Sequence, residues 1–384
     1  MMRSERSPRR RSSFASDSSA SGRRRFQGAS SIVAADVPVI DVTVSIVHAS
    51  RPDLTVECLE SLCADLGRRS SLEVVVLDNA AEDGLATCVR ERYSDVQVIS
   101  QPWRAGFSAN QNMIIRSTKS RYVFVLNPDT RVPAGTIDGL VKYLDTHPEV
   151  AVAGPLIRGF DGAQQGSAWR LVSIPVQSVW ALTLGRLGAV VSRGTTPRRV
   201  GAVSASAMLV RRSALELIGL FDETYFMFNE EAELARRLDR IGLERHYVPH
   251  VEVLHHGQVS TASVPERQVN ETWNSLDIYL ARYHSALGAR VIRGLTGFGY
   301  AVAMLAANAG MRLPALLRRS IATSWDPRLY RLHARDAFRG TRQPDLRQLA
   351  EEWNRSHGVV QPRGAAAPDP MPGPLRDSAV RREH

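Results

Sequence analysis

Three short apolar runs constrain the fold most, because each is followed by a segment whose apolar residues recur at helical spacing. The runs are DVTVSIVH at residues 41–48, LEVVVL at 72–77 and YVFVL at 122–126. Short runs rich in Val, Ile and Leu are typical of buried strands. Strands that alternate with helices predict an α/β fold with a mostly parallel sheet and helices on both faces.

The same patterns extend this prediction along most of the chain. Residues 160–196 have weak periodicity and predict a loop with a partly helical stretch near residues 176–184. Helices are expected at 54–66, 85–93, 108–117, 134–147, 212–218, 230–241 and 270–284, and further strands at 96–100, 200–210, 245–248 and 251–254.

Composition divides the 384 residues into four parts. Residues 1–36 are rich in Ser and Arg and are expected to be disordered. The α/β domain is expected at 37–284, followed by a basic, helical C-terminal extension at 285–360. Residues 361–384 are rich in Pro and Ala and form a second expected disordered tail.

The formal net charge of +10 belongs to the two ends of the chain. The first 36 residues carry +5 and the last 100 carry +8, which leaves −3 on the stretch between them. A slightly acidic core gives no reason to expect a nucleic-acid groove, so no specific nucleic-acid partner is expected. For the Arg-rich N-terminal tail, simple solvation is favoured over contact with anionic lipid or nucleic acid.

Cysteine usage and the N-terminus indicate a cytoplasmic protein. The three cysteines, Cys58, Cys63 and Cys88, form no C-x-x-C pair and are best interpreted as buried free thiols in a reducing compartment. The N-terminus has Arg clusters but no apolar run before Ile32, which argues against a secretory signal.

Polar residues follow two of the expected strands directly. Asp78 and Asn79 come after one strand, and Asn127 and Asp129 come after another. Ligands of open α/β sheets bind beyond the carboxyl ends of strands. A carboxylate at that edge can hold Mg²⁺ or Mn²⁺ against a diphosphate. The alternative is that N-P-D-T is only a turn, because Asn, Pro and Asp favour turns.

Two further groups of residues are candidates for catalysis or metal binding. Glu230, Glu231 and Glu233 begin an expected helix directly after the aromatic segment YFMF at 225–228. An apolar wall beside a carboxylate raises its pKa toward the range of a general base, although such acids often only complement the helix dipole. His255 ends an expected strand and could join a divalent metal, or it could simply be packed.

Seven motifs that occur in order give the sequence a family resemblance. From residue 42 to residue 284 it resembles family 2 glycosyltransferases, especially the rhamnosyltransferase-like branch that builds bacterial cell-wall and surface polysaccharides. The motifs are VSIVHASRPDL (44–54), VVVLDNAAEDG (74–84), RAGFSANQN (104–112), FVLNPDT (124–130), SAMLVRRSALELIGLFDE (206–223), YFMFNEEAELARRL (225–238) and HHGQVS (255–260).

This resemblance implies a GT-A fold and an inverting transfer of a sugar, with rhamnose as a candidate, from a nucleotide-diphosphate sugar. The acceptor would be a hydroxyl of a glycan or of a lipid-linked glycan, and the cofactor would be Mn²⁺ or Mg²⁺. By resemblance, the nucleotide-sugar contacts are Asp78, Asn79, Asn112 and Asn127, the metal ligands are Asp129 and His255, the general base is Glu231, and its supporting residues are Glu230 and Glu233.

The sequence departs from the family pattern at several positions. Glu231 stands where the family usually has Asp, and Arg104 replaces the usual Asn before the G-F element. Ala81 and Ala205 replace a usual Ser and a common Gly. These departures leave open a degenerate member that binds a nucleotide or a glycan without turnover.

The apolar stretch 295–307 suggests contact with a membrane. It is shorter than the ~20 residues that span a bilayer, and Arg293 and Arg312 flank it. An interfacial helix at the inner face of the plasma membrane is therefore expected, with basic residues that meet anionic headgroups. The alternative is a buried helix that packs on the α/β domain.

Overall fold

The computed structural model describes residues 40–66, 71–183, 189–257, 263–308, 327–339 and 343–362. All of them belong to one compact unit, Pro38–His384. The expected tail at 1–36 lies outside the described residues, and so does the second tail from residue 363 onward. The boundary expected after residue 284 stays a prediction.

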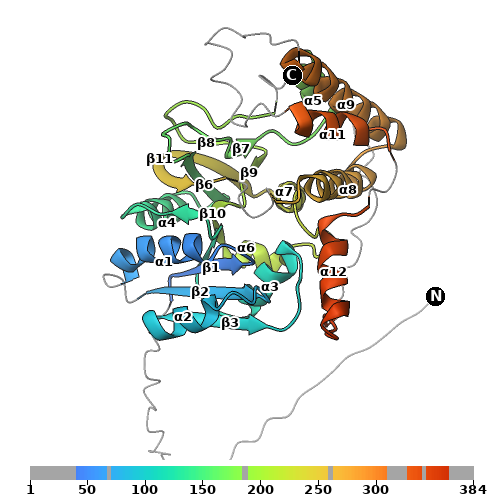
Figure 1. Cartoon of the computed structure of the whole chain (residues 1–384). Helices are drawn as coiled ribbons and strands as arrows, with labels where there is room; N and C mark the ends of the chain where they lie inside the picture. Colours follow the sequence, from blue (N-terminus) through green and yellow to red (C-terminus); the bar gives the residue numbers. More distant parts are fainter. Residues whose placement is uncertain are drawn as a thin grey trace, which may run out of the picture. The chain divides into compact units, whose positions relative to one another are not determined.

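Helices and strands alternate through the first half of the chain, as the sequence patterns predict (Figure 1). The strands are β1 (Val42–His48), β2 (Leu72–Asn79), β3 (Val96–Gln101), β4 (Tyr122–Leu126), β5 (Thr130–Arg131), β6 (Val150–Arg158), β7 (Ala168–Trp169), β8 (Arg198–Arg199), β9 (Ala202–Val203), β10 (Ala207–Arg211) and β11 (Glu244–His255). The helices are α1 (Pro52–Leu66), α2 (Leu85–Arg92), α3 (Phe107–Ser117), α4 (Thr136–Thr146), α5 (Ile174–Leu182), α6 (Arg212–Leu217), α7 (Glu230–Arg240), α8 (Pro265–Tyr283), α9 (Ala286–Asn308), α11 (Pro327–Asp336) and α12 (Leu346–Ser356).

The main sheet has the order β3-β2-β1-β4-β10-β6-β11-β5, and β8 pairs with β11. The α/β class and the mostly parallel sheet are confirmed, with β10, β5 and β8 as the antiparallel strands. Strands β1 to β4 are parallel, whereas β10 runs antiparallel to both β4 and β6. The reason is that β10 enters the sheet from the edge where β4 ends, where Asn127 N donates to Ser206 O.

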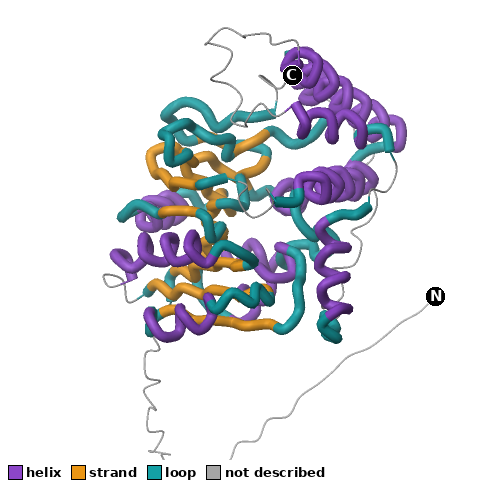
Figure 2. The backbone as a smooth tube through the Cα atoms, in the orientation of Figure 1, coloured by secondary structure: helices purple, strands orange, loops and turns teal. Residues whose placement is uncertain are grey.

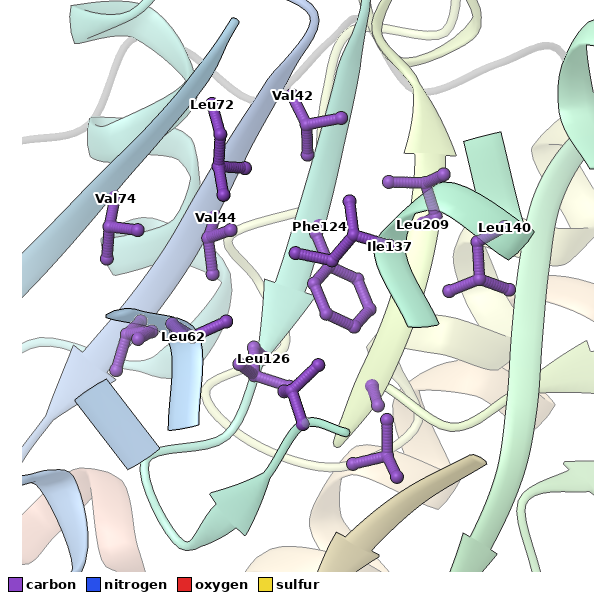
Figure 3. Packing of buried hydrophobic residues seen from close by; sticks show 14 of the residues in the cluster. Val42, Val44, Leu62, Leu72, Val74, Phe124, Leu126, Ile137, Leu140 and Leu209 are labelled. Atoms are coloured by element: carbon purple, nitrogen blue, oxygen red, sulfur yellow. The ribbon is translucent and has the colours of Figure 1, made fainter. Parts of the chain in front are cut away.

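Strand alternation divides the core into two layers. On one face, Val42, Val44 and Ile46 of β1 pack with side chains of α1, α2 and α4 (Figure 3). On the other face, α3, α6 and α7 pack against Val123 and Val125 of β4. The sheet is therefore covered on both sides, and its carboxyl edge remains for polar residues.

Strand β6 has no counterpart in the sequence prediction, because Gly154 and Pro155 interrupt its apolar run. Glycine is required there, since a Cβ atom at Gly154 would collide with the side chain of Val203. The two short strands expected at 245–248 and 251–254 form the single strand β11, with an irregularity between Val248 and Glu252.

The C-terminal helices form a further layer (Figure 2). Helix α8 packs against α9, α11 and α12, and α9 packs against α5 and α11. Within the described part of the chain, each helix is too short or too polar to cross a bilayer. The three cysteines are free thiols, but only Cys58 is buried, which corrects the expectation for Cys63 and Cys88.

Candidate active site

The carboxyl ends of β1, β2 and β4 lie side by side. His48 at the end of β1 pairs with Asp78, and Ile46 pairs with Leu126, the last residue of β4. The polar residues that follow β2 and β4 therefore meet at one edge of the sheet, as the sequence predicts.

Strand β5 brings Asp129 to His255. Thr130 of β5 pairs with His255 at the end of β11, and His256 N donates to Asp129 O over 3.0 Å. As a result, Nε2 of His255 lies 3.3 Å from Oδ1 of Asp129. The two side chains are only 7% and 5% exposed, so this carboxylate–imidazole pair is held inside the protein.

Gln165 fixes the tautomer of His255. Its Oε1 lies 2.9 Å from Nδ1 of His255, and its Nε2 donates to the carbonyl of His255 over 2.8 Å. An amide oxygen can only accept, so Nδ1 carries a proton. Nε2 is left facing Oδ1 of Asp129, and it makes no hydrogen bond of good geometry within the described chain.

This donor set fits a divalent cation. An imidazole nitrogen and a carboxylate oxygen that face each other are both ligands of divalent cations, and a metal-bound histidine commonly donates its other N–H to a fixed acceptor. No cluster of three or more His, Cys, Asp or Glu suited to a metal exists within the described ranges. The remaining ligands of a cation held by Asp129 and His255 would be water and phosphate oxygens, which is usual for Mg²⁺.

Asp78 and Asn79 are placed differently, although they are adjacent. Asn79 is buried and fully used by a neighbouring loop, since it donates to Ala105 O over 3.1 Å and accepts from Ala105 N over 2.9 Å. Asp78 is half-buried and accepts from Ala81 N over 3.0 Å. The structure thus gives Asn79 the task of shaping the loop, and leaves Asp78 accessible at the edge of the sheet.

Asn127 is tied to the turn that enters β10. Its backbone N–H donates to Ser206 O over 2.9 Å, and its Nδ2 donates to Ser206 Oγ over 3.3 Å. Ser204 Oγ in turn lies 3.1 Å from Ser206 Oγ. This polar turn packs close to α7, because α7 contacts strand β9 directly before it.

Two of the expected site residues are engaged inside the protein. Nδ2 of Asn112 donates to Phe221 O and to Glu223 Oε1, while its Oδ1 accepts from Phe221 N. Glu233, 1% exposed, accepts from Arg237 and from Tyr283 OH. Both residues anchor the segment around the start of α7, and their roles toward a ligand stay predictions.

Glu230 and Glu231 begin α7 behind a strained turn. Phe228 and Asn229 have φ values of 70° and 63°, a left-handed conformation that costs non-glycine residues about 1–3 kcal/mol each. Burial raises the pKa of Glu231 to about 7. Burial, and then the charge of Glu231, raises the pKa of Glu230 well above its usual value.

The two glutamates differ in access. Glu230 is buried, and its Oε2 lacks a hydrogen-bond partner within the described chain, whereas Glu231 is partly exposed. A carboxylate with a pKa near 7 that solvent can reach is suited to accept a proton from a bound hydroxyl. The geometry therefore favours Glu231 over Glu230 as a general base.

Comparison with known proteins supplies the family. The model described as "Glycosyl transferase family 2" matches residues 43–219. The chain is 31% identical over 272 residues to the N-acetylglucosaminyl-diphospho-decaprenol L-rhamnosyltransferase of Mycobacterium tuberculosis (strain H37Rv), which covers 65% of this chain and 85% of the relative. It is 26% identical over 255 residues to the Rhamnosyltransferase WbbL of Escherichia coli (strain K12), which covers 63% and 93% of the two chains.

A solved structure shares the fold. The mannosyltransferase PcManGT from Pyrobaculum calidifontis, in complex with GDP-Man and Mn²⁺, is 16% identical with a TM-score of 0.53, and the match covers 78% of this chain and 88% of that one. The chain thus has a fold of the GT-A type. The chain belongs to glycosyl transferase family 2, the class of inverting enzymes that the sequence motifs indicated.

Sequence reasoning missed Gln165. It lies in a segment without periodicity, 90 residues before the histidine that it orients. It also missed Glu271 on α8, which is 3% exposed and whose pKa is raised to about 7 by burial and then by the charge of Asp345. Neither residue carries a motif, and only the folded chain brings them to the site segments.

Proposed function

We propose that this enzyme transfers an L-rhamnosyl group from a nucleoside-diphosphate sugar to a hydroxyl of a lipid-linked glycan, with inversion and with the help of a divalent cation. The observation that carries the proposal is the buried contact of 3.3 Å between Nε2 of His255 and Oδ1 of Asp129, beside the carboxyl edge of the sheet. The named activities of the two rhamnosyltransferase relatives supply the candidate sugar, and the name of the first supplies the class of acceptor.

Each residue then has a defined task. Asp78 accepts hydrogen bonds from the base or the ribose of the donor. Asn79 holds the loop beside it, Asn127 holds the turn before β10, and Asn112 anchors the segment before α7. Asp129 and His255 hold the cation. When bound, a divalent cation neutralises the negative charge that develops on the departing diphosphate.

Glu231 deprotonates the acceptor hydroxyl. As the acceptor oxygen forms its bond to the anomeric carbon, the bond from that carbon to the diphosphate oxygen breaks. The electron pair leaves with the nucleoside diphosphate, and the proton stays on Glu231. A single displacement of this kind inverts the configuration at the anomeric carbon, and a base with a pKa near 7 is matched to neutral pH.

An exposed apolar stripe on α9 supports work at a membrane surface. Leu287, Val291, Phe298 and Leu305 are exposed at spacings of 4, 7 and 7 residues, which place them on one helical face. Arg290 is exposed on the same helix. We propose that this stripe contacts an anionic lipid surface, where a lipid-linked acceptor resides.

One basic residue that was expected to meet the lipid headgroups is used inside the protein instead. Arg293, which the sequence predicted to meet headgroups, instead donates to Asp277 over 2.9 and 3.0 Å and to the carbonyl of Ala337. It therefore holds helices together. Arg312, the other residue that flanks the stretch, lies outside the described residues.

The direct test is transfer of radiolabelled L-rhamnose from its nucleoside-diphosphate donors to N-acetylglucosaminyl-diphospho-polyprenol, with Mn²⁺, Mg²⁺ or EDTA. The expected result is a metal-dependent lipid product of inverted configuration. Binding of the donor without any turnover on this acceptor or on other glycans would instead favour the degenerate, non-catalytic member of the family. Full activity in EDTA would remove the metal from the proposal.

A further inference from the structure

Helix α12, far beyond the segment that the family model matches, is attached to a loop at the donor edge of the sheet. The side-chain amide of buried Asn354 makes two hydrogen bonds to the backbone of Arg104. Its Oδ1 accepts from Arg104 N over 2.7 Å, and its Nδ2 donates to Arg104 O over 2.9 Å. The guanidinium of Arg104 lies 4.3 Å above the ring of Trp353.

This attachment reaches the residues next to Asp78. Nε and Nη2 of Arg104 both donate to the carbonyl of Ala80 over 3.3 Å, two residues after Asp78. The following residue, Ala105, is the one that Asn79 holds by two hydrogen bonds. The loop at 102–106 is thus fixed from the sheet by Asn79, and from the C-terminal extension by Trp353 and Asn354.

The other end of α12 is attached to the segment that leads to Glu231. Nη2 of Arg347 donates to Thr224 O over 2.7 Å, and its guanidinium lies 5.5 Å from the ring centroid of Phe226. The backbone N–H of Arg347 donates to Glu271 over 3.4 Å. One helix therefore contacts both the loop beside the donor residues and the segment before the base.

These two segments also touch each other. Phe107 N donates to Phe226 O over 2.7 Å, and Gly106 leaves no room for a side chain, because a Cβ there would lie 2.5 Å from Phe226 O. Figure 1 shows α12 on the side to which strands β1, β2 and β3 point. A helix that braces two touching segments at this edge restricts their motion before any ligand arrives.

We propose that α12 is a built-in part of the donor site, in which Trp353 and Asn354 are positioning residues that act through Arg104. The inference rests on the proposed function, because it assigns the edge beside Asp78 to a nucleotide. Its physical basis is preorganisation: a loop held in its binding conformation loses less entropy when the nucleotide binds. Arg347 has the corresponding task for the segment before Glu231.

The experiment measures the affinity of the full chain for UDP, GDP and dTDP in Mn²⁺ by titration calorimetry, together with the KM of the donor, kcat and Tm. Asn354→Asp replaces the donor to Arg104 O by a repelling oxygen, and Trp353→Ala removes the platform. Each is expected to weaken nucleotide binding and raise the KM of the donor roughly five- to tenfold, with kcat changed less than about twofold. Trp353→Phe should restore most of the affinity, and Arg347→Ala should lower kcat more than it raises the KM of the donor.

The matched control is Glu351→Gln on the exposed face of the same helix, which should leave all four quantities unchanged. Unchanged nucleotide affinity in both Asn354→Asp and Trp353→Ala would overturn the inference, even if Tm falls, because α12 would then only stabilise the fold. Failure of the unmodified chain to bind any of the three nucleotides would instead overturn the proposed function, and the role of α12 with it.

Discussion

Nε2 of His255 faces Oδ1 of Asp129 at 3.3 Å, while Gln165 holds the imidazole proton on the opposite nitrogen. The pair is buried at the edge of the sheet, where both groups can coordinate the same divalent cation. A cation that binds the folded chain and not the unfolded chain stabilises the fold, so we expect metal to raise Tm.

Asp129→Asn keeps the shape of the side chain and removes its charge. We expect loss of Mn²⁺-dependent nucleotide binding, with a fold that is retained because Asp129 lies at the edge of the sheet rather than in its apolar core. Titration calorimetry with and without Mn²⁺ measures the effect. An affinity for the nucleotide that still rises with Mn²⁺ as in the unmodified chain would show that Asp129 is not a ligand.

Gln165→Leu removes the hydrogen bond that orients the ring of His255, while both expected metal ligands, Asp129 and His255, are kept. Loss of the group that orients a metal-binding histidine typically costs about 10- to 100-fold in metal affinity, and we expect a loss in this range. The measurement is the shift of Tm with Mn²⁺ concentration. Gln97→Leu, on an exposed position of β3, is the control and should behave as the unmodified chain does; equal metal affinity in both variants would contradict the role of Gln165.

Glu231→Gln removes a proton acceptor and keeps the shape. Because the pKa of Glu231 is about 7, the carboxylate form increases as pH rises, and kcat of the unmodified enzyme should rise through about pH 7. The variant should lose about 10² to 10⁴ in kcat and the rising limb of the profile. Near-normal kcat in Glu231→Gln would move the base to Glu230 or end the assignment.

Glu271→Gln tests a buried carboxyl whose proton is coupled to folding. Ser275 Oγ lies 2.8 Å from Met227 O and 3.2 Å from Glu271 Oε1, and burial raises the pKa of Glu271 from 4.5 to about 7. The folded chain therefore keeps a proton that the unfolded chain releases above pH 4.5, so stability is full below that pH and falls as pH rises through about 7.

We expect Glu271→Gln to lessen this fall by on the order of 1–3 kcal/mol between pH 5 and pH 8. Tm or urea unfolding at the two pH values measures it. Glu351→Gln, which changes an exposed carboxylate, is the control. The same loss of stability between the two pH values in Glu271→Gln and in the unmodified chain would exclude Glu271 as its source.

The exposed stripe on α9 is tested with vesicles. The double variant Phe298→Ser and Leu305→Ser removes two large side chains, 55% and 61% exposed, from its outer face. We expect it to lose most co-flotation with anionic liposomes at low salt. Leu217→Ser, which removes a 70% exposed side chain from α6, is the matched control and should float normally. Equal flotation of all three proteins would show that the stripe does not contact lipid.

Local patterns were sufficient for most helices and for the strands whose apolar runs are uninterrupted. They missed β6, because Gly154 and Pro155 interrupt its apolar run, and only the folded chain shows that Val203 packs where a side chain at Gly154 would lie. They gave no direction for β10, because the turn before it, rather than its own composition, decides which way the strand runs.

The sequence predicted part of the candidate site as well. Motif order predicted that Asp129 and His255 lie together, as they do, and burial raises the pKa of Glu231 in the direction expected beside an aromatic segment. The roles of these residues as metal ligands and base stay predictions. Neither pattern nor motif could indicate that the side chains of Asn112 and Glu233 form hydrogen bonds inside the protein. Such engagement depends on partners that are far apart in the chain.

The link between Asn354 and Arg104 joins residues 250 positions apart. A graft limited to the segment that the family model matches, residues 43–219, would include Arg104 and leave out Asn354. In this chain such a graft would introduce a foreign loop at 102–106 opposite an unchanged α12. In a chimeric enzyme, the loop at 102–106 and the stretch 343–357 should therefore come from the same parent protein.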